Sequence, residues 1–460
     1  MQTVQDARHL ASVSCLPMYR YVAPQAKAGL HENDGRLPPS ACGCLNRYES
    51  VCKFQILFDN SCHSLLSLNL QGGCALTGAS QTLHECPLIG QKGVSMKTVY
   101  KHGTADSVAD GVAAELRDCA FIVYCADDKR FAEISSKLYS RMPGVQMIGT
   151  TGFMLNENGS FAEGISAIGF PASEVEVCVG VLAQIDTCPI KYLSGLSKAV
   201  DTINQKYKNN ICFEFATGYE EKVVSTMKIC LEKTGMRLIG GTPGNTTQDS
   251  PKKVACNGQV LTDAAVYAVI GSKLGKIEIF KENLFRKSAN THSVTKVSAD
   301  ERTVYEIDGR KAMDVYQEEL GYTASTVGEG VFKNPLGRIV GADYYITAIF
   351  SFNPDRSIST YKNCQKNDLI CFTEIEEDYK GFMRDNMERL TASHKVAGII
   401  SINCILRYLF FENNGYTGDY AQMMNSMAKG CHWGVVSDGE QYVEQHVNQS
   451  MVCIVFTKDN

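Results

Sequence analysis

The stretch from Val396 to Arg407 reads Val-Ala-Gly-Ile-Ile-Ser-Ile-Asn-Cys-Ile-Leu-Arg, and it decides the class of fold. Its first part, 396–402, is a continuous apolar run with the length and composition of a buried strand. The run ends in Asn403 and Cys404, and Arg407 follows where we expect a helix to begin. The pattern therefore predicts a strand that passes into a helix, with a thiol and a guanidinium close to the point of change.

The residues after this stretch complete an α/β element. We expect a helix over about 416–429, a glycine-rich turn over 434–442 and a closing strand over 450–456. In open α/β sheets, ligands bind where strands end and loops converge. One polar turn carries Arg407 and the other carries Gly439 and Glu440, so the sequence predicts a site for a polar or zwitterionic small molecule.

Length and composition set the outer limits. A chain of 460 residues is long enough for two or three domains. Its formal charge of −5 gives no electrostatic support for nucleic acid or anionic membrane as a partner. Because no apolar run reaches the roughly 18–20 residues of a membrane span and no secretory signal is visible, we predict a cytoplasmic protein. In a reducing cytosol its cysteines are thiols, which behave as small buried hydrophobes.

Residues 1–95 differ from the rest, because they show no sustained helical or strand pattern. Their Cys and His residues are irregularly spaced for structural zinc, which prefers compact C-x₂₋₄-C pairs. Lys92-Gly93-Val94 can be encoded by a purine-rich sequence that resembles a bacterial ribosome-binding site, and Met96 follows it. We therefore predict that 1–95 is a non-native or disordered extension and that the native chain starts at Met96.

From Met96 onward, strands and helices alternate. A helix over 107–116, a strand over 119–125, a helix to about 141 and a strand over 145–148 form a β-α-β start. Turns rich in glycine and threonine are expected at 149–153 and again at 240–242, where Thr hydroxyls and backbone N–H groups contact a ligand or simply stabilise the turn. The alternation predicts a mixed α/β and α+β fold with partly parallel sheets.

Several motifs occur in a specific order towards the C-terminus: a strand ending in Cys-x-x-Arg, a Glu, a Gly-x-x-x-x-Gly-Glu segment and an Asn-Gln-Ser strand. The residues are Cys404, Arg407, Glu412, Gly434, Gly439, Glu440, Asn448, Gln449 and Ser450. This order resembles the C-terminal half of FIST (F-box and intracellular signal transduction) proteins, and the 149–152 turn resembles their N-terminal signature. The resemblance covers about residues 98–456.

The resemblance implies an N-terminal α/β domain over 96–300 and a C-terminal domain over 301–460. It also implies a sensory protein that binds an amino acid or related small metabolite and signals to a separate output protein. The implied ligand-binding residues are Thr150, Thr151, Gly152, Gly241, Thr242, Cys404, Arg407, Gly439 and Glu440. In this hypothesis Arg407 receives a carboxylate, and Glu440 receives an amine or holds Arg407 in a structural ion pair.

Two alternatives stay open. A subset of FIST proteins resembles haem-based nitric oxide sensors, and His394, His432 and His446 are the candidate haem ligands here. The other alternative is a cysteine-dependent enzyme in which Cys404 is the nucleophile and His432 or His446 is the base. No phosphate-loop, zincin or G-x-S-x-G motif is present, so an enzyme has less support than a sensor.

Overall fold

The computed structural model describes residues 95–156, 158–246, 250–392 and 394–459, which belong to the unit from Gly93 to Asn460. The predicted extension, residues 1–95, lies outside this range except for its last residue. Within the described residues, no helix has both the length and the apolar character that a membrane crossing requires.

The described chain builds the same topological unit three times. In each unit a helix joins the first two long strands, a second helical segment leads to a third strand, and a fourth strand returns between the first and the second. The second and third strands are parallel in every unit, and parallel neighbours need such helical crossovers. The predicted mixed α/β fold is therefore confirmed.

The first unit has the strand order β1-β6-β2-β3. It consists of β1 (Lys97–Lys101), α2 (Ala105–Leu116), β2 (Cys119–Ala126), α3 (Phe131–Arg141), β3 (Gln146–Thr151), the hairpin β4 (Met154–Asn156) and β5 (Gly159–Phe161), and β6 (Ile165–Pro171).

The second unit has the order β7-β12-β8-β9. It consists of β7 (Val175–Ala183), the 3₁₀ turn η2 (Pro189–Tyr192), α4 (Leu193–Asn204), β8 (Asn210–Ala216), α5 (Glu220–Leu231), η3 (Glu232–Thr234), β9 (Leu238–Pro243), the hairpin β10 (Val254–Cys256) and β11 (Gln259–Leu261), and β12 (Ala264–Ser272).

The third unit has the order β13-β26-β23-β24. It consists of β13 (Ile277–Asn283), α8 (Tyr379–Ala392), β23 (Lys395–Cys404), α9 (Ile405–Asn413), α10 (Thr417–Met427), β24 (His432–Tyr442), β25 (Gln445–Val447) and β26 (Ser450–Lys458). The strand-to-helix change predicted near Cys404 is confirmed, since β23 ends at this residue and α9 begins at the next.

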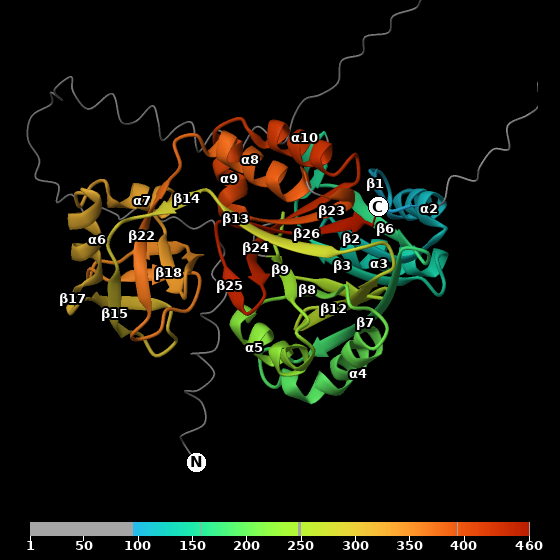
Figure 1. Cartoon of the computed structure of the whole chain (residues 1–460), viewed down its shortest axis with the longest axis horizontal. Helices are drawn as coiled ribbons and strands as arrows, with labels where there is room; N and C mark the ends of the chain where they lie inside the picture. The colour runs from blue at the N-terminus through green and yellow to red at the C-terminus, as the bar shows by residue number, and fades with distance from the viewer. Residues whose placement is uncertain (1–94, 157, 247–249, 393, 460) are drawn as a thin grey trace, which may run out of the picture. The chain divides into compact units, whose positions relative to one another are not determined.

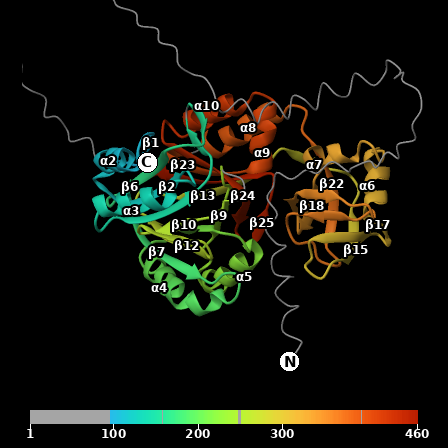
Figure 2. The ribbon, with the colours of Figure 1, turned by 180° about the vertical axis from the view of Figure 1, so that it is seen from behind.

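Two large sheets pack face to face. Strands β9 and β24 pair antiparallel, so the second and third units share one eleven-stranded sheet, which the β4–β5 hairpin also joins. The other four strands of the first unit form a six-stranded sheet with β10 and β11. Apolar side chains of both sheets, such as Phe121, Phe213 and Trp433, form the core between them. Helices α2 and α3 cover the outer face of the smaller sheet, and α4 and α5 cover part of the outer face of the larger one (Figures 1 and 2).

A separate, mainly antiparallel module is inserted between β13 and α8. This inserted module, residues 284–378, has its own apolar core. It contains β14 (Phe285–Lys287), β15 (His292–Val297), β16 (Thr303–Ile307), β17 (Arg310–Lys311), α6 (Ala312–Leu320), η4 (Val327–Glu329), α7 (Gly330–Lys333), β18 (Leu336–Val340), β19 (Asp343–Thr347), β20 (Ile349–Phe352), β21 (Ile358–Thr360) and β22 (Leu369–Ile375).

Three predicted glycine turns are strands instead. Residues 149–151 lie in β3, 240–242 lie in β9, and 434–442 lie in β24. The glycines make room for a large side chain of a neighbouring strand, which is a second reason for glycine in a sheet. A Cβ atom at Gly240 would lie 2.2 Å from Oε1 of Glu214, and one at Gly439 would lie 2.4 Å from Nε2 of His446.

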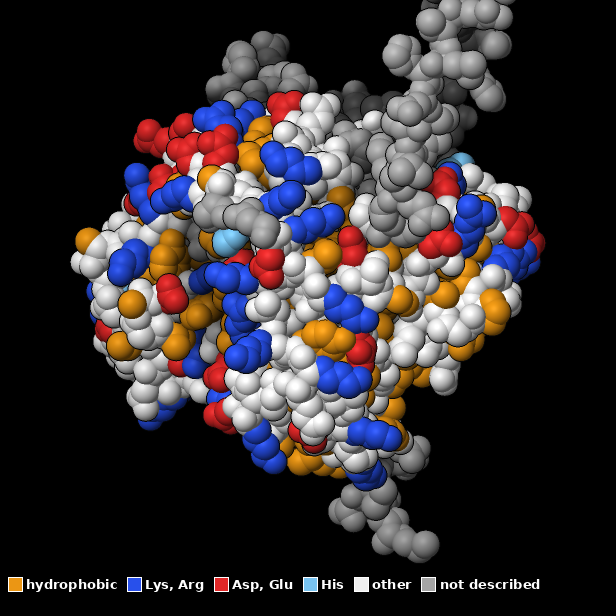
Figure 3. All heavy atoms as spheres, turned by 45° about the vertical axis from the view of Figure 1, so that its right-hand side comes forward, with side chains coloured by type: hydrophobic (Ala, Val, Ile, Leu, Met, Phe, Trp, Pro, Cys, Tyr) orange, Lys and Arg blue, Asp and Glu red, His pale blue; other side chains and the backbone are white. Residues whose placement is uncertain are grey.

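The surface shows charges of both signs. On the face in Figure 3, Lys and Arg side chains are interspersed with acidic and hydrophobic side chains. The large hydrophobic side chains that are exposed lie on different elements: Ile190, Tyr219, Ile229, Phe332, Val340, Leu369 and Phe382. This mixed surface agrees with the modest net charge of the sequence.

Candidate functional site

The carboxyl-terminal ends of β3 and β9 meet beside the middle of β24. Gly152, directly after β3, forms an isolated bridge with Gly244, directly after β9. A Cβ atom at Gly152 would lie 2.9 Å from the carbonyl oxygen of Val436 in β24. The Thr151 hydroxyl donates to Oδ1 of Asn245 over 2.8 Å. The predicted segment with Thr150, Thr151 and Gly152 therefore lies beside the other predicted segments, although it is distant from them in the sequence.

Four predicted residues are direct neighbours on β9 and β24. Gly439 pairs with Thr242, and Glu440 pairs with Gly241. Side chains alternate between the two faces of a strand, so Thr242 and Glu440 point in opposite directions. Thr242 donates to Oε1 of Glu220 at 2.9 Å, on the face covered by α5. The backbone groups of Gly241 and Thr242 face neighbouring strands, because β9 lies between β8 and β24.

Cys404 and Glu440 lie together on the other face, which is buried between the sheets. Cys404 is aligned with Ser437, whose hydroxyl donates to Oε1 of Glu440 over 2.6 Å. Burial raises the pKa of Glu440 well above its usual value. Burial and then the Glu440 carboxyl also raise the pKa of the Cys404 thiol. Because the thiolate is the nucleophile, this environment does not favour Cys404 as a catalytic residue.

Arg407 has an ion-pair partner that no sequence motif indicates. Its Nη2 atom lies 2.6 Å from Oε2 of Glu282 in β13, and the two side chains are 0% and 2% exposed. The rings of Phe411 and Tyr420 lie 4.9 and 5.5 Å from the guanidinium. The suggested ion pair between Arg407 and Glu440 is thus replaced by Arg407–Glu282, because α9 turns Arg407 towards α8 and α10. No local pattern around Glu282 could have identified it, since the two residues meet only through sheet pairing.

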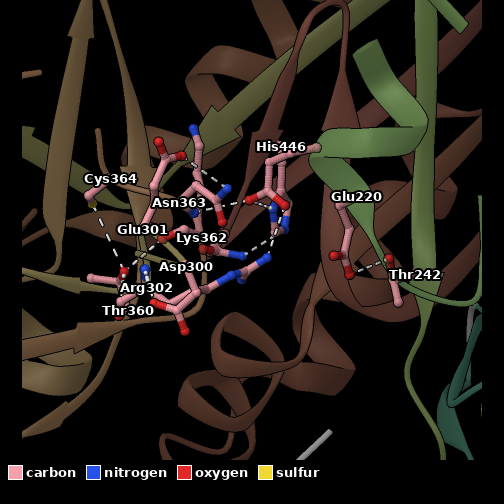
Figure 4. Close-up of polar contacts among 12 residues, drawn as sticks. Glu220, Thr242, Asp300, Glu301, Arg302, Thr360, Lys362, Asn363, Cys364 and His446 are labelled. Atoms are coloured by element: carbon pink, nitrogen blue, oxygen red, sulfur yellow. Dashed lines mark hydrogen bonds and ion pairs between the residues drawn. The ribbon is translucent and has the colours of Figure 1, made fainter. Parts of the chain in front are cut away.

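A second polar cluster connects the inserted module with α5 and β25. We call it the junction site and define it as Glu220, Glu221, Arg302, Lys362, Asn363 and His446. Figure 4 shows the residues of the inserted module on one side of His446, and Glu220 with Thr242 on the other. The site therefore combines side chains from three separate parts of the chain.

Glu221 is the centre of the junction site. Its Oε2 atom lies 2.9 Å from Nη2 of Arg302, and its Oε1 atom lies 3.0 Å from Nδ1 of His446. The backbone N–H of Asn363 donates to the same Oε1 over 3.0 Å. Burial by itself raises the pKa of Glu221, but His446 and Arg302 outweigh it, so the pKa lies well below its usual value. A carboxylate at the first turn of α5 also benefits from the positive end of the helix dipole.

Lys362 differs from the other charged residues of the junction. It is 2% exposed, and its Nζ atom has no hydrogen-bond partner among the described residues. The ring centroid of Tyr345 lies 5.9 Å from Nζ. Burial, and then the positive charge of Arg338, lower the pKa of Lys362 to about 8. Lys362 belongs to no recognisable sequence motif, and its burial becomes visible only in the folded module.

The junction also contains a group of potential metal ligands. One atom each of Glu220, Glu221 and His446 lies within 4.8 Å of the other two. Arg302, Asn363 and His446 already occupy both oxygens of Glu221, and Thr242 donates to Glu220. A metal ion here would have to displace these contacts. Two cavities, of about 580 and 170 Å³, are lined by residues of α8 and of the α5–β9 region, respectively, outside this cluster.

Two of the candidate haem ligands, His446 and His432, are buried and hydrogen-bonded within the fold. His446 is hydrogen-bonded through both ring nitrogens, to Glu221 at 3.0 Å and to the Asn448 side chain at 3.2 Å. His432 is 1% exposed, and its Nε2 atom lies 2.8 Å from the Ser401 hydroxyl. Burial lowers the pKa of His432 to about 3. Both ring nitrogens of His446 are thus engaged, whereas Nδ1 of His432 has no hydrogen-bond partner among the described residues.

Comparisons with known proteins agree with the resemblance seen in the sequence. A family model described as the FIST N domain matches residues 119–310, and one described as the FIST C domain matches residues 312–443. The search of curated proteins found no match. FIST domains are associated with signal transduction and small-ligand sensing. Because the two models together cover more than half of the chain, this protein belongs to the FIST family and carries both of its domains.

Proposed function

We propose that this protein is a cytoplasmic sensor that binds an amino acid or a related zwitterionic metabolite in the junction site and signals to a separate partner protein. The observation that carries the proposal is the Lys362 ammonium group, which is buried and has no hydrogen-bond partner within the described residues. Buried polar groups of native proteins almost always have partners. A ligand carboxylate is the partner that this ammonium group lacks.

The balance of charge at the junction favours a zwitterion. Besides His446, the site contains two carboxylates and two cations: Glu220 and Glu221 against Arg302 and Lys362. A zwitterion adds no net charge to this balanced set, in which Lys362 is buried and the other three residues are half-buried. Its carboxylate would contact Lys362, and its ammonium group would contact Glu220.

This proposal moves the carboxylate-binding role from Arg407 to Lys362. Arg407 already has a protein carboxylate at 2.6 Å, whereas Lys362 has none within hydrogen-bond distance in the described chain. Thr242 would take part through Glu220, and Gly439 would take part by leaving room for the His446 ring. The Thr150–Gly152 segment, Cys404 and Glu440 would line the neighbouring strand ends rather than contact the ligand carboxylate.

Signalling would follow from the position of the site. Polar groups of the inserted module contact the rest of the fold here: Arg302 and Asn363 bind Glu221, and the backbone N–H of Ala348 donates to Asn448. A ligand that contacts both sides would favour one arrangement of the module over another. Such a shift of population is the signal that a partner would read.

The test is thermal and calorimetric titration of the whole chain with a panel of L-amino acids. Each amino acid is compared with the amine that lacks its carboxylate and with the acid that lacks its ammonium group. An amino acid present at 100 times its Kd should stabilise the folded protein by about 2.7 kcal/mol. We expect Lys362→Met to abolish this stabilisation and both truncated analogues to bind poorly.

The matched control is Lys333→Met, which removes an exposed lysine of the same module that pairs with Glu329 at 2.9 Å. This variant should respond to the amino acid like the wild type. Equal stabilisation of the Lys362→Met variant and the wild type would refute the proposed site.

A further inference from the structure

Glu214 is a buried acidic residue that the proposed function does not use. It lies in β8, it is 0% exposed, and neither of its carboxyl oxygens has a hydrogen-bond partner among the residues that the structure describes. Burial, and then the nearby Glu220 carboxylate, raise its pKa well above the usual value. A buried, ionised carboxylate without a counter-charge raises the free energy of the folded protein. The Glu214 carboxyl must therefore bind either a proton or a cation.

The neighbouring strands place further oxygen atoms beside this carboxyl group. Glu214 pairs with Gly240 of β9, and Gly240 pairs with Gln441 of β24, so the three residues form a row on one face of the sheet. Gly240 has no side chain, and the Glu214 carboxyl lies over it. Gln441 is also 0% exposed, and its Oε1 atom has no hydrogen-bond partner in the described chain.

The same row leads to a second carboxylate. The Nε2 atom of Gln441 donates to the Thr242 hydroxyl over 3.3 Å, and this hydroxyl donates to Oε1 of Glu220 over 2.9 Å. Since the Gln441 amide uses its nitrogen in this chain, its carbonyl oxygen stays available. Three unpartnered oxygens of Glu214 and Gln441 therefore lie in the same row, next to the carboxylate of Glu220.

We propose that Glu214, Gln441 and Glu220 form a buried subsite for a small cation that prefers oxygen ligands. Carboxylate and amide oxygens are the ligands of hard metal ions such as Mg²⁺, Ca²⁺ and Mn²⁺, and an ammonium group accepts the same partners. As the cation enters, the Glu214 carboxyl releases its proton to solvent, so the exchange is balanced in charge for a monovalent cation. The subsite lies beneath α5 and shares Glu220 with the junction site, but it does not require a ligand at Lys362.

The experiment uses the full chain after exhaustive dialysis against a chelator. Mg²⁺, Ca²⁺, Mn²⁺, K⁺ and methylammonium are added separately, and binding is followed by calorimetry and by the midpoint of thermal unfolding. Infrared difference spectra record whether the band of a protonated carboxylic acid disappears when the cation binds. The metal ions and methylammonium are the two arms that distinguish a metal site from a site for a ligand amine.

We expect at least one cation to raise the midpoint and remove the protonated-acid band of the wild type. Glu214→Gln keeps the shape of the side chain but removes its charge. It should lower the affinity for this cation by about 10- to 100-fold, because one or more charged contacts are lost. The control is Glu440→Gln, which changes a buried carboxyl on the opposite face of the same sheet and should keep the affinity.

If Glu214→Gln fails to fold, Gln441→Leu removes the amide oxygen and leaves Glu214 intact, and the infrared measurement on the wild type needs no variant. A wild type whose midpoint and spectrum respond to none of the five cations would overturn the proposal. An unchanged affinity in the Glu214→Gln or Gln441→Leu variant would overturn it as well.

Discussion

Arg407 in the third unit and Lys362 in the inserted module are almost equally buried, yet their surroundings differ in kind. The Arg407 guanidinium has Glu282 at 2.6 Å and two aromatic rings beside it. The Lys362 ammonium has an aromatic ring at 5.9 Å, and it lacks a hydrogen-bond partner in the part of the chain that is described.

The difference shows that burial alone does not distinguish a ligand-binding charged side chain from a structural one. A buried ion pair whose members satisfy each other holds elements together, as Arg407 and Glu282 connect α9 to β13. A buried charge without a protein partner needs one from elsewhere. The four predictions below test this comparison, starting with the largest expected effect.

The largest effect is expected from Arg407→Ala. It would leave the Glu282 carboxylate buried without its partner, which costs about 3–5 kcal/mol. Urea unfolding of the variant and the wild type measures the difference. Replacing both residues, as Arg407→Met with Glu282→Leu, should recover most of the stability. Apolar side chains of similar volume can fill the buried site without leaving an unpaired charge. If the single variant were as stable as the wild type, Arg407 would not be a structural residue.

Gly439→Ala should have the next largest effect. A Cβ atom there would lie 2.4 Å from Nε2 of His446, so the ring must move away from Glu221. Overpacking of this kind costs about 1–3 kcal/mol, and chemical denaturation measures it. Gly418→Ala on α10 is the control, since a Cβ atom there meets nothing within 4 Å. Equal losses in both variants would contradict the close approach of His446 to Gly439.

Glu221→Gln should make the free energy of unfolding less sensitive to a fall in pH below about 4.5. The pKa of Glu221 is lower in the folded protein than in the unfolded chain, where a Glu has a pKa of about 4.3. The unfolded state therefore binds more protons in this range, and the stabilisation by Glu221 is present above about pH 4.5 and is lost as the pH falls. Above that pH the substitution should cost about 1–2 kcal/mol. A stability difference that stays constant from pH 7 to 3.5 would contradict this prediction.

The smallest effect is expected from Lys333→Ala. Lys333 and Glu329 form a pair at 2.9 Å, but their side chains are 57% and 56% exposed. Exposed pairs contribute about 0–1 kcal/mol, so the unfolding midpoint should barely change. A loss comparable to that of Arg407→Ala would show that exposure is the wrong criterion for these charges.

The sequence predicted the order of the elements well, because apolar runs and helical spacing are local properties. The Asn257-Gly258 hairpin occurs as expected, with φ angles of 47° and 81°. Gly149, Gly240 and Gly439 lie in strands and not in the expected turns. Glycine is needed at these positions because a side chain of the adjacent strand occupies the space of a Cβ atom. A single sequence does not show which strand is adjacent.

By itself, the sequence determined the α/β class, the strand that ends at Cys404 and the resemblance to FIST proteins, since all three can be read from apolar runs and short motifs in their order along the chain. Only the tertiary structure decided which charges meet. Arg407 and Glu282 are 125 residues apart, and Glu221 and His446 are 225 residues apart. Whether a buried charge is satisfied depends on atoms within about 3–4 Å of it, and sheet pairing between the three units sets those distances.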